Sequence, residues 1–171
     1  MPKTNVDASK EATELLSRLK ITAAPTPVEK IAKELGAQIR FAPFDKEISG
    51  MIHVQDGTIV IGVNALDHPN RQRFTIAHEI GHLIMHREKI TSHVHIDKGF
   101  NAALMRDTRS AAGTDAVEVQ ANHFASVLLV PQALLDEELA GRGAIDMEDE
   151  KSLEDLARKF KVSKQVIQYR L

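Results

Sequence analysis

Residues 71–86 read Arg-Gln-Arg-Phe-Thr-Ile-Ala-His-Glu-Ile-Gly-His-Leu-Ile-Met-His, and their hydrophobic residues recur with the period of a helix. On a helical wheel the apolar residues fill one continuous arc, and the polar and titratable residues fill the complementary arc. The first arc holds Phe74, Ile76, Ala77, Ile80, Gly81, Leu83, Ile84 and Met85, and the second holds Thr75, His78, Glu79, His82 and His86. The pattern predicts a helix over about 70–86 with its apolar side in the core and its titratable side facing a cleft.

Within this helix, residues 78–82 form the pattern H-E-x-x-H. His78 and His82 lie on one face about one turn apart, where two imidazoles can hold one zinc ion. Glu79 directly follows the first histidine, which puts its carboxylate beside the metal as a general base for the zinc-bound water. A chain of this composition would contain about 0.03 such patterns by chance, so we interpret the pattern as a metal-binding motif.

A catalytic zinc ion needs a third protein ligand, and the sequence has no cysteine to supply it. The candidate is Glu118, on a second long helix predicted over 115–130. It lies beside that helix's core stripe, which comprises Val117, Ala121, Phe124 and Leu128. A carboxylate beside an apolar stripe is costly without a partner, and a metal ion would be one. The alternative is an ordinary glutamate at the flank of the stripe.

Two further residues are predicted to lie next to the metal ligands without binding the metal. Asn122, one turn after Glu118, can bind the second ring nitrogen of a ligand histidine and fix its tautomer. His86, one turn beyond His82, is predicted at the rim of the site in a structural or hydrogen-bonding role.

Other histidines receive weaker interpretations. The segment 87–114 is predicted to be a long loop, whose length favours function or mobility. It contains His93, His95 and Asp97, which we expect to be solvent-exposed, with stabilisation of a tetrahedral intermediate as the alternative. His123 points about 140° away from Glu118 on its helix, so we do not predict it to be a ligand.

The rest of the chain predicts an α+β fold. Short segments over 38–41, 48–54 and 58–63 are β-branched or alternating, and residues 55–57 give a hairpin turn signal. We therefore expect a small three-stranded antiparallel sheet beside a zincin-like helical core, in which one helix carries H-E-x-x-H and another carries the glutamate. Further helices are predicted over 9–20, 27–35, 152–160 and 163–171. The expected parts are a helix and linker over 1–26, a core over 27–131 and a C-terminal helical segment over 132–171.

Composition narrows the class of protein. The 171 residues are 43% hydrophobic and 27% charged, which is typical of a soluble globular chain. The absence of cysteine excludes disulfides, zinc ribbons, iron–sulfur clusters and thiol nucleophiles. The longest nearly unbroken apolar stretch, 124–130, is far shorter than the ~20 residues of a membrane span, and the first residues lack the apolar region of a secretory signal. We expect a cytoplasmic protein with no membrane association.

The two motifs together resemble the ImmA/IrrE family of zinc-dependent metallopeptidases. The resemblance covers about 27–171 and rests on residues 71–83, His86, Glu118, Ala121-Asn122-x-Phe124-Ala125 and Leu128-Leu129-Val130-Pro131. It implies that His78, His82 and Glu118 bind Zn²⁺ and that Glu79 is the base. It also implies an endopeptidase that cleaves XRE-type helix-turn-helix repressors and so derepresses mobile-element or stress and DNA-damage-response genes. In a His₂-carboxylate site, Mn²⁺ or another divalent ion is an alternative.

The last residues suggest a second possibility. Residues 153–171 resemble a helix-turn-helix pair with Val162-Ser163 as turn and N-cap, and five bases between Arg158 and Arg170 could contact phosphates. We favour a packing role for this pair over DNA contact. The alternative function is a non-catalytic DNA- or repressor-binding regulator with a structural metal. Glu79 favours the enzyme, because a structural site has no use for a base beside the metal.

Overall fold

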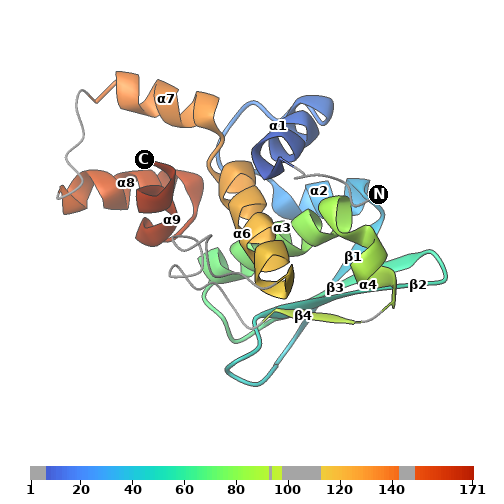
Figure 1. The fold of residues 1–171 in the computed structure, drawn as a ribbon. Helices are drawn as coiled ribbons and strands as arrows, with labels where there is room; N and C mark the ends of the chain where they lie inside the picture. The colour runs from blue at the N-terminus through green and yellow to red at the C-terminus, as the bar shows by residue number, and fades with distance from the viewer. Residues whose placement is uncertain (1–6, 93, 98–112, 143–148) are drawn as a thin grey trace.

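The helix α3 (Pro69–Met85) contains the H-E-x-x-H residues and lies between the sheet and the helix α6 (Gly113–Leu129) (Figure 1). The computed structural model describes residues 7–92, 94–97, 113–142 and 149–171. Pro69 occupies the first turn of α3, and the side chain of His68 caps the helix by accepting a hydrogen bond from the backbone nitrogen of Asn70. The observed bounds differ by one residue from the predicted helix.

The close approach of α3 and α6 depends on a glycine. A Cβ atom at Gly81 would lie 3.0 Å from Cδ1 and 3.2 Å from Cγ of Phe124, whose side chain is fully buried. Such contacts are tighter than ordinary packing allows, so the missing side chain permits the two helices to come together. This approach brings the polar side of α3 opposite the residues of α6 that the sequence singled out.

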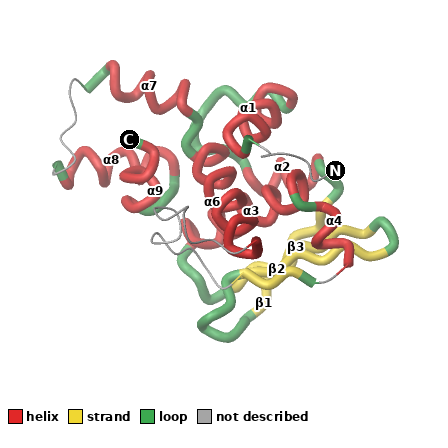
Figure 2. Tube along the Cα trace, in the orientation of Figure 1, coloured by secondary structure: helices red, strands yellow, loops and turns green. Residues whose placement is uncertain are grey.

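Helices and strands segregate in the molecule, with the helices gathered on one side of the sheet (Figure 2). This arrangement confirms the predicted α+β class. The other helices are α1 (Ala8–Arg18), α2 (Val28–Glu34), α4 (Arg87–Ser92), α7 (Gln132–Ala140), α8 (Glu150–Phe160) and α9 (Lys164–Arg170). The strands are β1 (Ala37–Ala42), β2 (Gly50–Gln55), β3 (Thr58–Asn64) and β4 (His95–Asp97).

The predicted three-stranded antiparallel sheet is wrong in two respects. The described sheet has four strands in the order β1-β3-β2-β4, and β1 runs parallel to β3. The hairpin of β2 and β3 forms as expected, with Asp56 and Gly57 at positive φ in the turn. β1 is not joined to β2 by a tight turn, so it could reach β3 from the other side and pair in parallel.

The fourth strand comes from the segment predicted as a loop. Within 87–114, the described residues form α4 and then β4, which pairs antiparallel with β2. Three residues are too few to show a period-2 pattern in the sequence, and their pairing partner lies more than forty residues away. The predicted loop is therefore wrong over these residues; His93 and 98–112 lie outside the described part.

The C-terminal helices pack against the rest of the chain. Val166 and Ile167 of α9 are buried, and Ser163 caps this helix by accepting from the backbone nitrogen of Val166, as predicted. Arg170 donates a hydrogen bond to the backbone carbonyl of Val130 at the end of α6. Among the helices that the structure describes, none is long and apolar enough to cross a membrane.

Candidate metal centre

The packing of α3 against α6 brings the three predicted ligands to one point. His78 Nε2 lies 3.0 Å from His82 Nε2 and 3.2 Å from Glu118 Oε2. His82 Nε2 lies 3.3 Å from Glu118 Oε1. Both imidazoles are buried, whereas 23% of the Glu118 side chain is exposed. The one-turn spacing on α3 and the flank position on α6 therefore converge on a single set of donor atoms.

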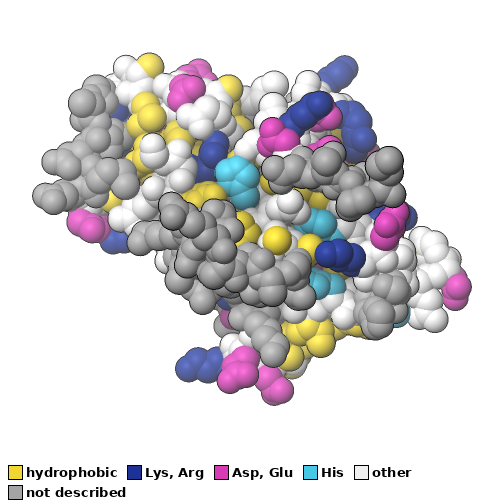
Figure 3. Space-filling model, in the orientation of Figure 1, with side chains coloured by type: hydrophobic (Ala, Val, Ile, Leu, Met, Phe, Trp, Pro, Cys, Tyr) yellow, Lys and Arg dark blue, Asp and Glu magenta, His cyan; other side chains and the backbone are white. Residues whose placement is uncertain are grey.

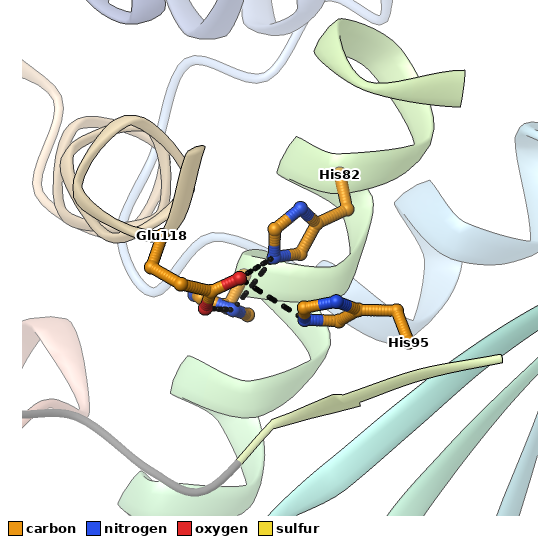
Figure 4. A group of neighbouring side chains, drawn as sticks. His82, His95 and Glu118 are labelled. Atoms are coloured by element: carbon orange, nitrogen blue, oxygen red, sulfur yellow. Dashed lines mark hydrogen bonds and ion pairs between the residues drawn. The ribbon is translucent and has the colours of Figure 1, made fainter. Parts of the chain in front are cut away.

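A third histidine joins them from the sheet. His95 of β4 points its Nε2 atom at Glu118 Oε1 across 3.3 Å, and its ring centroid lies 3.9 Å from that of His82 (Figure 4). Donor atoms of His78, His82, His95 and Glu118 all lie within 4.8 Å of one another. His95 was predicted to lie in a loop, and its place among the possible metal donors was not predicted from the sequence.

The expected solvent exposure of His95 is wrong, and strand pairing explains why. His95 is paired with Ile52 of β2, and paired residues project from the same face of a sheet. Ile52 is fully buried on the side of the helices, so His95 projects to that side too, and only 21% of its side chain is exposed. Ile96, one residue on, faces the other way and is exposed. The sequence signal that could have predicted this orientation is the alternation of two polar residues, His95 and Asp97, along one strand.

Hydrogen bonds fix the orientation of His82. His86 Nε2 lies 2.9 Å from the side-chain amide oxygen of Gln120, to which it donates a hydrogen bond. His86 Nδ1 is therefore an acceptor when the ring is neutral, and it accepts a hydrogen bond from His82 Nδ1 across 3.2 Å. The remaining nitrogen of His82, Nε2, keeps its lone pair and points into the cluster. Burial lowers the pKa of His82 to about 3, which keeps this imidazole neutral.

A hydrogen bond orients the ring of His78 as well, although its pKa shifts the other way. Burial acts to lower this pKa, but the hydrogen bond to Glu118 and the nearby acidic charges raise it to about 9. The Nδ1 atom of His78 lies 2.8 Å from the amide oxygen of Asn122 and donates to it, so Nε2 is the nitrogen that faces the cluster. The structure thus brings both predicted supporting residues, Asn122 and His86, into contact with the predicted ligands. Gln120, which completes the chain to His86, was not identified from the sequence.

Glu79 occupies a different environment from Glu118. Its side chain is completely buried, and neither carboxyl oxygen has a hydrogen-bond partner among the described residues. Burial raises the pKa of Glu79 well above its ordinary value, the nearby His78 opposes the shift, and the charge of Asp97 adds to it. Burial also acts to raise the pKa of Glu118, but its hydrogen bonds to His78 and His82 outweigh this and lower it. The two carboxyl groups therefore differ: hydrogen bonds favour the ionised form of Glu118, and burial favours the protonated form of Glu79.

Asp97 is the other buried acid at the site. It is 5% exposed, and its carboxylate belongs with His78 and Glu79 to a second set of possible donors within 4.8 Å of one another. Its backbone carbonyl accepts a hydrogen bond from the backbone nitrogen of Ser49. The sequence analysis expected it to be exposed, and it is buried because it alternates with Ile96 in β4.

These residues fit a divalent metal ion. Zinc bound tetrahedrally at 2.0–2.1 Å would hold neighbouring donor atoms about 3.3 Å apart. Four of the contacts among these residues measure 3.0 to 3.3 Å, and one donor atom from each residue lies within 4.8 Å of the others. Imidazole and carboxylate donors suit zinc and several other divalent ions.

The centre is reached from the surface. A cleft of about 180 Å³ is lined by His82, His95 and Glu118 together with residues of α4, and this is the cleft expected on the polar side of α3. On the face of the molecule seen in Figure 3, histidine side chains reach the surface beside apolar ones. By contrast, His123 lies away from this cluster and contacts Ser9 and Tyr169.

The fold and the site define a class, an α+β metallopeptidase-like domain whose metal donors come from two packed helices and a strand. The chain belongs to the Peptidase_M78 family, the IrrE N-terminal-like domain, whose family model matches residues 32–171. This match confirms the resemblance to the ImmA/IrrE family. No curated protein matches the chain.

A solved structure shows the same fold. The chain is similar to a Mycobacterium tuberculosis transcriptional regulator, with a TM-score of 0.62 and 16% sequence identity. The match covers 96% of this chain and 46% of that one, so this chain spans less than half the length of the regulator. At this identity the likeness concerns the fold.

Proposed function

We propose that the chain is a zinc-dependent endopeptidase, with His78, His82 and Glu118 as metal ligands and Glu79 as the general base. The observation that carries the proposal is the contrast between the two glutamates. An ionised Glu118 lies among imidazole nitrogens that point at it, while Glu79 is buried next to them and neither of its oxygens has a hydrogen-bond partner among the described residues. A buried, partnerless carboxyl group beside a cation site is costly for folding, and its position suits proton transfer.

The roles of the residues follow from this arrangement. When bound, the metal ion supplies Lewis-acid chemistry, polarising the scissile carbonyl and lowering the pKa of a water molecule. Glu79 takes the proton from the water and delivers it to the leaving amine. Asn122 and His86 hold the two histidines in the tautomers that leave Nε2 free for the ion.

The proposed substrate is an XRE-type helix-turn-helix repressor, whose cleavage would derepress mobile-element or stress-response genes in the cytoplasm. Membership of the Peptidase_M78 family supports this proposal. A place for an extended peptide is supported by β4, which stands at one end of the described strand order and carries His95 into the site. A peptide paired with β4 would gain main-chain hydrogen bonds with little demand on its sequence.

The test is incubation with helix-turn-helix repressors, first the one encoded beside this gene, with and without a chelator. Chelator-sensitive cleavage is expected in the wild type. Glu79→Gln should bind zinc normally and lose cleavage, whereas His78→Ala should lose both. His53→Ala, on the opposite face of the sheet, is the matched control and should cleave normally. Cleavage by Glu79→Gln, or cleavage that resists the chelator, would refute the mechanism.

The alternative of a DNA-binding regulator gains little from the C-terminal helices. Lys164 contacts Glu150 and Glu154, and Lys159 Nζ lies 3.0 Å from Glu138 Oε1. These acids from α7 and α8 offset the bases that could have met phosphates. The packing of α9 explains the helix pair without DNA. The predicted division of the chain into three parts, with boundaries after residues 26 and 131, stays a prediction.

A further inference from the structure

His95 has a buried nitrogen with no hydrogen-bond partner. Its Nε2 atom is inaccessible to solvent, and among the described residues it makes no hydrogen bond of acceptable geometry. Glu118 Oε1 lies 3.3 Å from this nitrogen, but the contact lacks the geometry of a hydrogen bond. An unpartnered buried nitrogen costs free energy. Its direction, into a group of three other donor atoms, indicates what would satisfy it.

The position of His95 is set by the backbone. β4 pairs with β2 through Ile52, and the backbone carbonyl of Asp97 accepts from Ser49 at the other end of the strand. The hydroxyl of Ser49 in turn accepts two hydrogen bonds from Arg71 of α3, at 2.8 and 3.0 Å. The strand that carries His95 is therefore tied to the helix that carries the other two histidines.

The number of donors matters for what the centre can do. Three imidazoles and one carboxylate complete the four positions of tetrahedral zinc. A catalytic zinc ion keeps one position open, and a zinc ion with four protein ligands is closed. The sequence motifs account for three donors, and His95 is the fourth.

We propose that His95 is a displaceable fourth protein ligand, which closes the metal centre when no substrate is bound. This inference rests on the proposed metal centre and adds a resting state to it. Because β4 is also the strand proposed to pair with the substrate, the peptide would arrive at the same strand that carries the ligand to be displaced. Catalysis then requires that the bond to His95 be released while His78, His82 and Glu118 stay in place.

The test counts the imidazoles that bind zinc in the full chain, without reference to activity. Long-range ¹H–¹⁵N spectra of the chain labelled at histidine report each ring nitrogen separately, before and after addition of zinc. We expect the Nε2 signals of His78, His82 and His95 to move on zinc binding. His95→Phe replaces the imidazole by an aromatic ring without nitrogen, so only two zinc-sensitive Nε2 signals, those of His78 and His82, should remain. The same substitution should also weaken zinc binding by more than about tenfold in competition with a chromophoric chelator, because loss of an outer partner alone costs that much.

The control is His53→Phe in β2. His53 neighbours the buried Ile52 and projects from the opposite face of the sheet, so this variant should keep three zinc-sensitive signals and the wild-type affinity. If the His95 signal ignores zinc while those of His78 and His82 move, the inference is wrong and the proposed metal centre stands. If no histidine signal moves, both fail. Should His95→Phe not fold, the wild-type count of three signals or two decides.

Discussion

Glu79 shows how strongly one side chain depends on its surroundings. A glutamate on the exposed surface of a helix would be ionised and unremarkable, but the side chain of Glu79 is completely buried. Burial raises its pKa because water cannot solvate the carboxylate, and the charges of Asp97 and Glu118 raise it further against the opposing effect of His78. A cation at the adjacent donors would lower this cost, so the chemistry of Glu79 is coupled to occupation of the metal centre.

A second residue, Gln120, is expected to affect the metal only indirectly, through His86 and His82. Gln120→Leu removes the acceptor for His86 Nε2, so His86 can no longer hold the Nδ1 proton of His82 in place. We expect zinc affinity to fall by about tenfold to a hundredfold, with little change in the far-UV circular dichroism. Competition with a chromophoric chelator measures the affinity. Gln55→Leu, at an exposed end of β2, is the control, and equal affinities for the two variants would contradict this role.

At the residue scale, the sequence predicts candidate metal ligands when they lie on a long helix. His78, His82 and Glu118 could be placed because helical periodicity relates each to a core stripe a turn away. His95 could not be placed in the same way, since its direction depends on pairing with Ile52, a contact between distant parts of the chain. Gln120 was missed for a related reason, as its partner His86 caps the end of α3, in a distant part of the chain.

At the scale of elements, the contact between α3 and α6 holds the ligands of the two helices in register. Gly81→Ala would put a methyl group within 3.0 to 3.3 Å of the fully buried Phe124, so this side chain or its helix would have to move by a few tenths of an ångström. We expect a loss of about 1–3 kcal/mol in the free energy of unfolding, measured by urea denaturation. Adding Phe124→Leu should recover part of that loss, and a double variant whose losses simply add would refute the overlap.

Another contact joins three helices that lie far apart in the sequence. His123 of α6 lies 2.7 Å from the hydroxyl of Ser9 in α1 and 2.8 Å from that of Tyr169 in α9. Burial lowers the pKa of His123 below its ordinary 6.5, and the charge of Arg170 lowers it further, against an opposing effect of Asp7. The folded state therefore binds this proton less readily than the unfolded chain does.

The expected consequence is a loss of stability in acid. Because the folded pKa of His123 is depressed, its stabilising contribution is complete above about pH 6.5 and is lost as the pH falls below that value. Urea denaturation between pH 5 and 8 should show a smaller acid loss for His123→Gln than for the wild type, since glutamine does not titrate. His53→Gln serves as the control, and an unchanged pH profile in His123→Gln would rule out this origin.

The sheet marks the limit of prediction at the element scale. The hairpin of β2 and β3 was predictable because its turn, at Asp56 and Gly57, is local. The parallel pairing of β1 with β3 and the addition of β4 both join segments separated in sequence, and no local pattern specifies them. The long helices were predicted well because each carries its own periodicity and end signals, whereas the six-residue helix α4 lies in a segment predicted as a loop.

At the scale of the whole molecule, the metal centre links the two sides of the fold. Its donors come from α3, from α6 and from β4, so an ion held by them would connect the helical layer to the sheet (Figures 1 and 4). Within the described part of the chain, this region buries Glu79 without a hydrogen-bond partner and leaves the Nε2 atom of His95 unsatisfied. An ion that binds only the folded chain should therefore stabilise the whole molecule.

The size of that effect can be predicted. At free zinc a thousandfold above the dissociation constant, binding adds about 4 kcal/mol to the free energy of unfolding, which for a chain of this length raises Tm by roughly 8–16 °C. Differential scanning calorimetry of chelator-treated protein, with and without added zinc, measures the shift. His78→Ala should abolish it, whereas Glu79→Gln should retain it, because Glu79 is assigned to proton transfer and not to the ion. If Glu79→Gln also loses the zinc-dependent rise in Tm, as His78→Ala is expected to, Glu79 is a metal ligand. The roles assigned to Glu79 and Glu118 would then have to be exchanged.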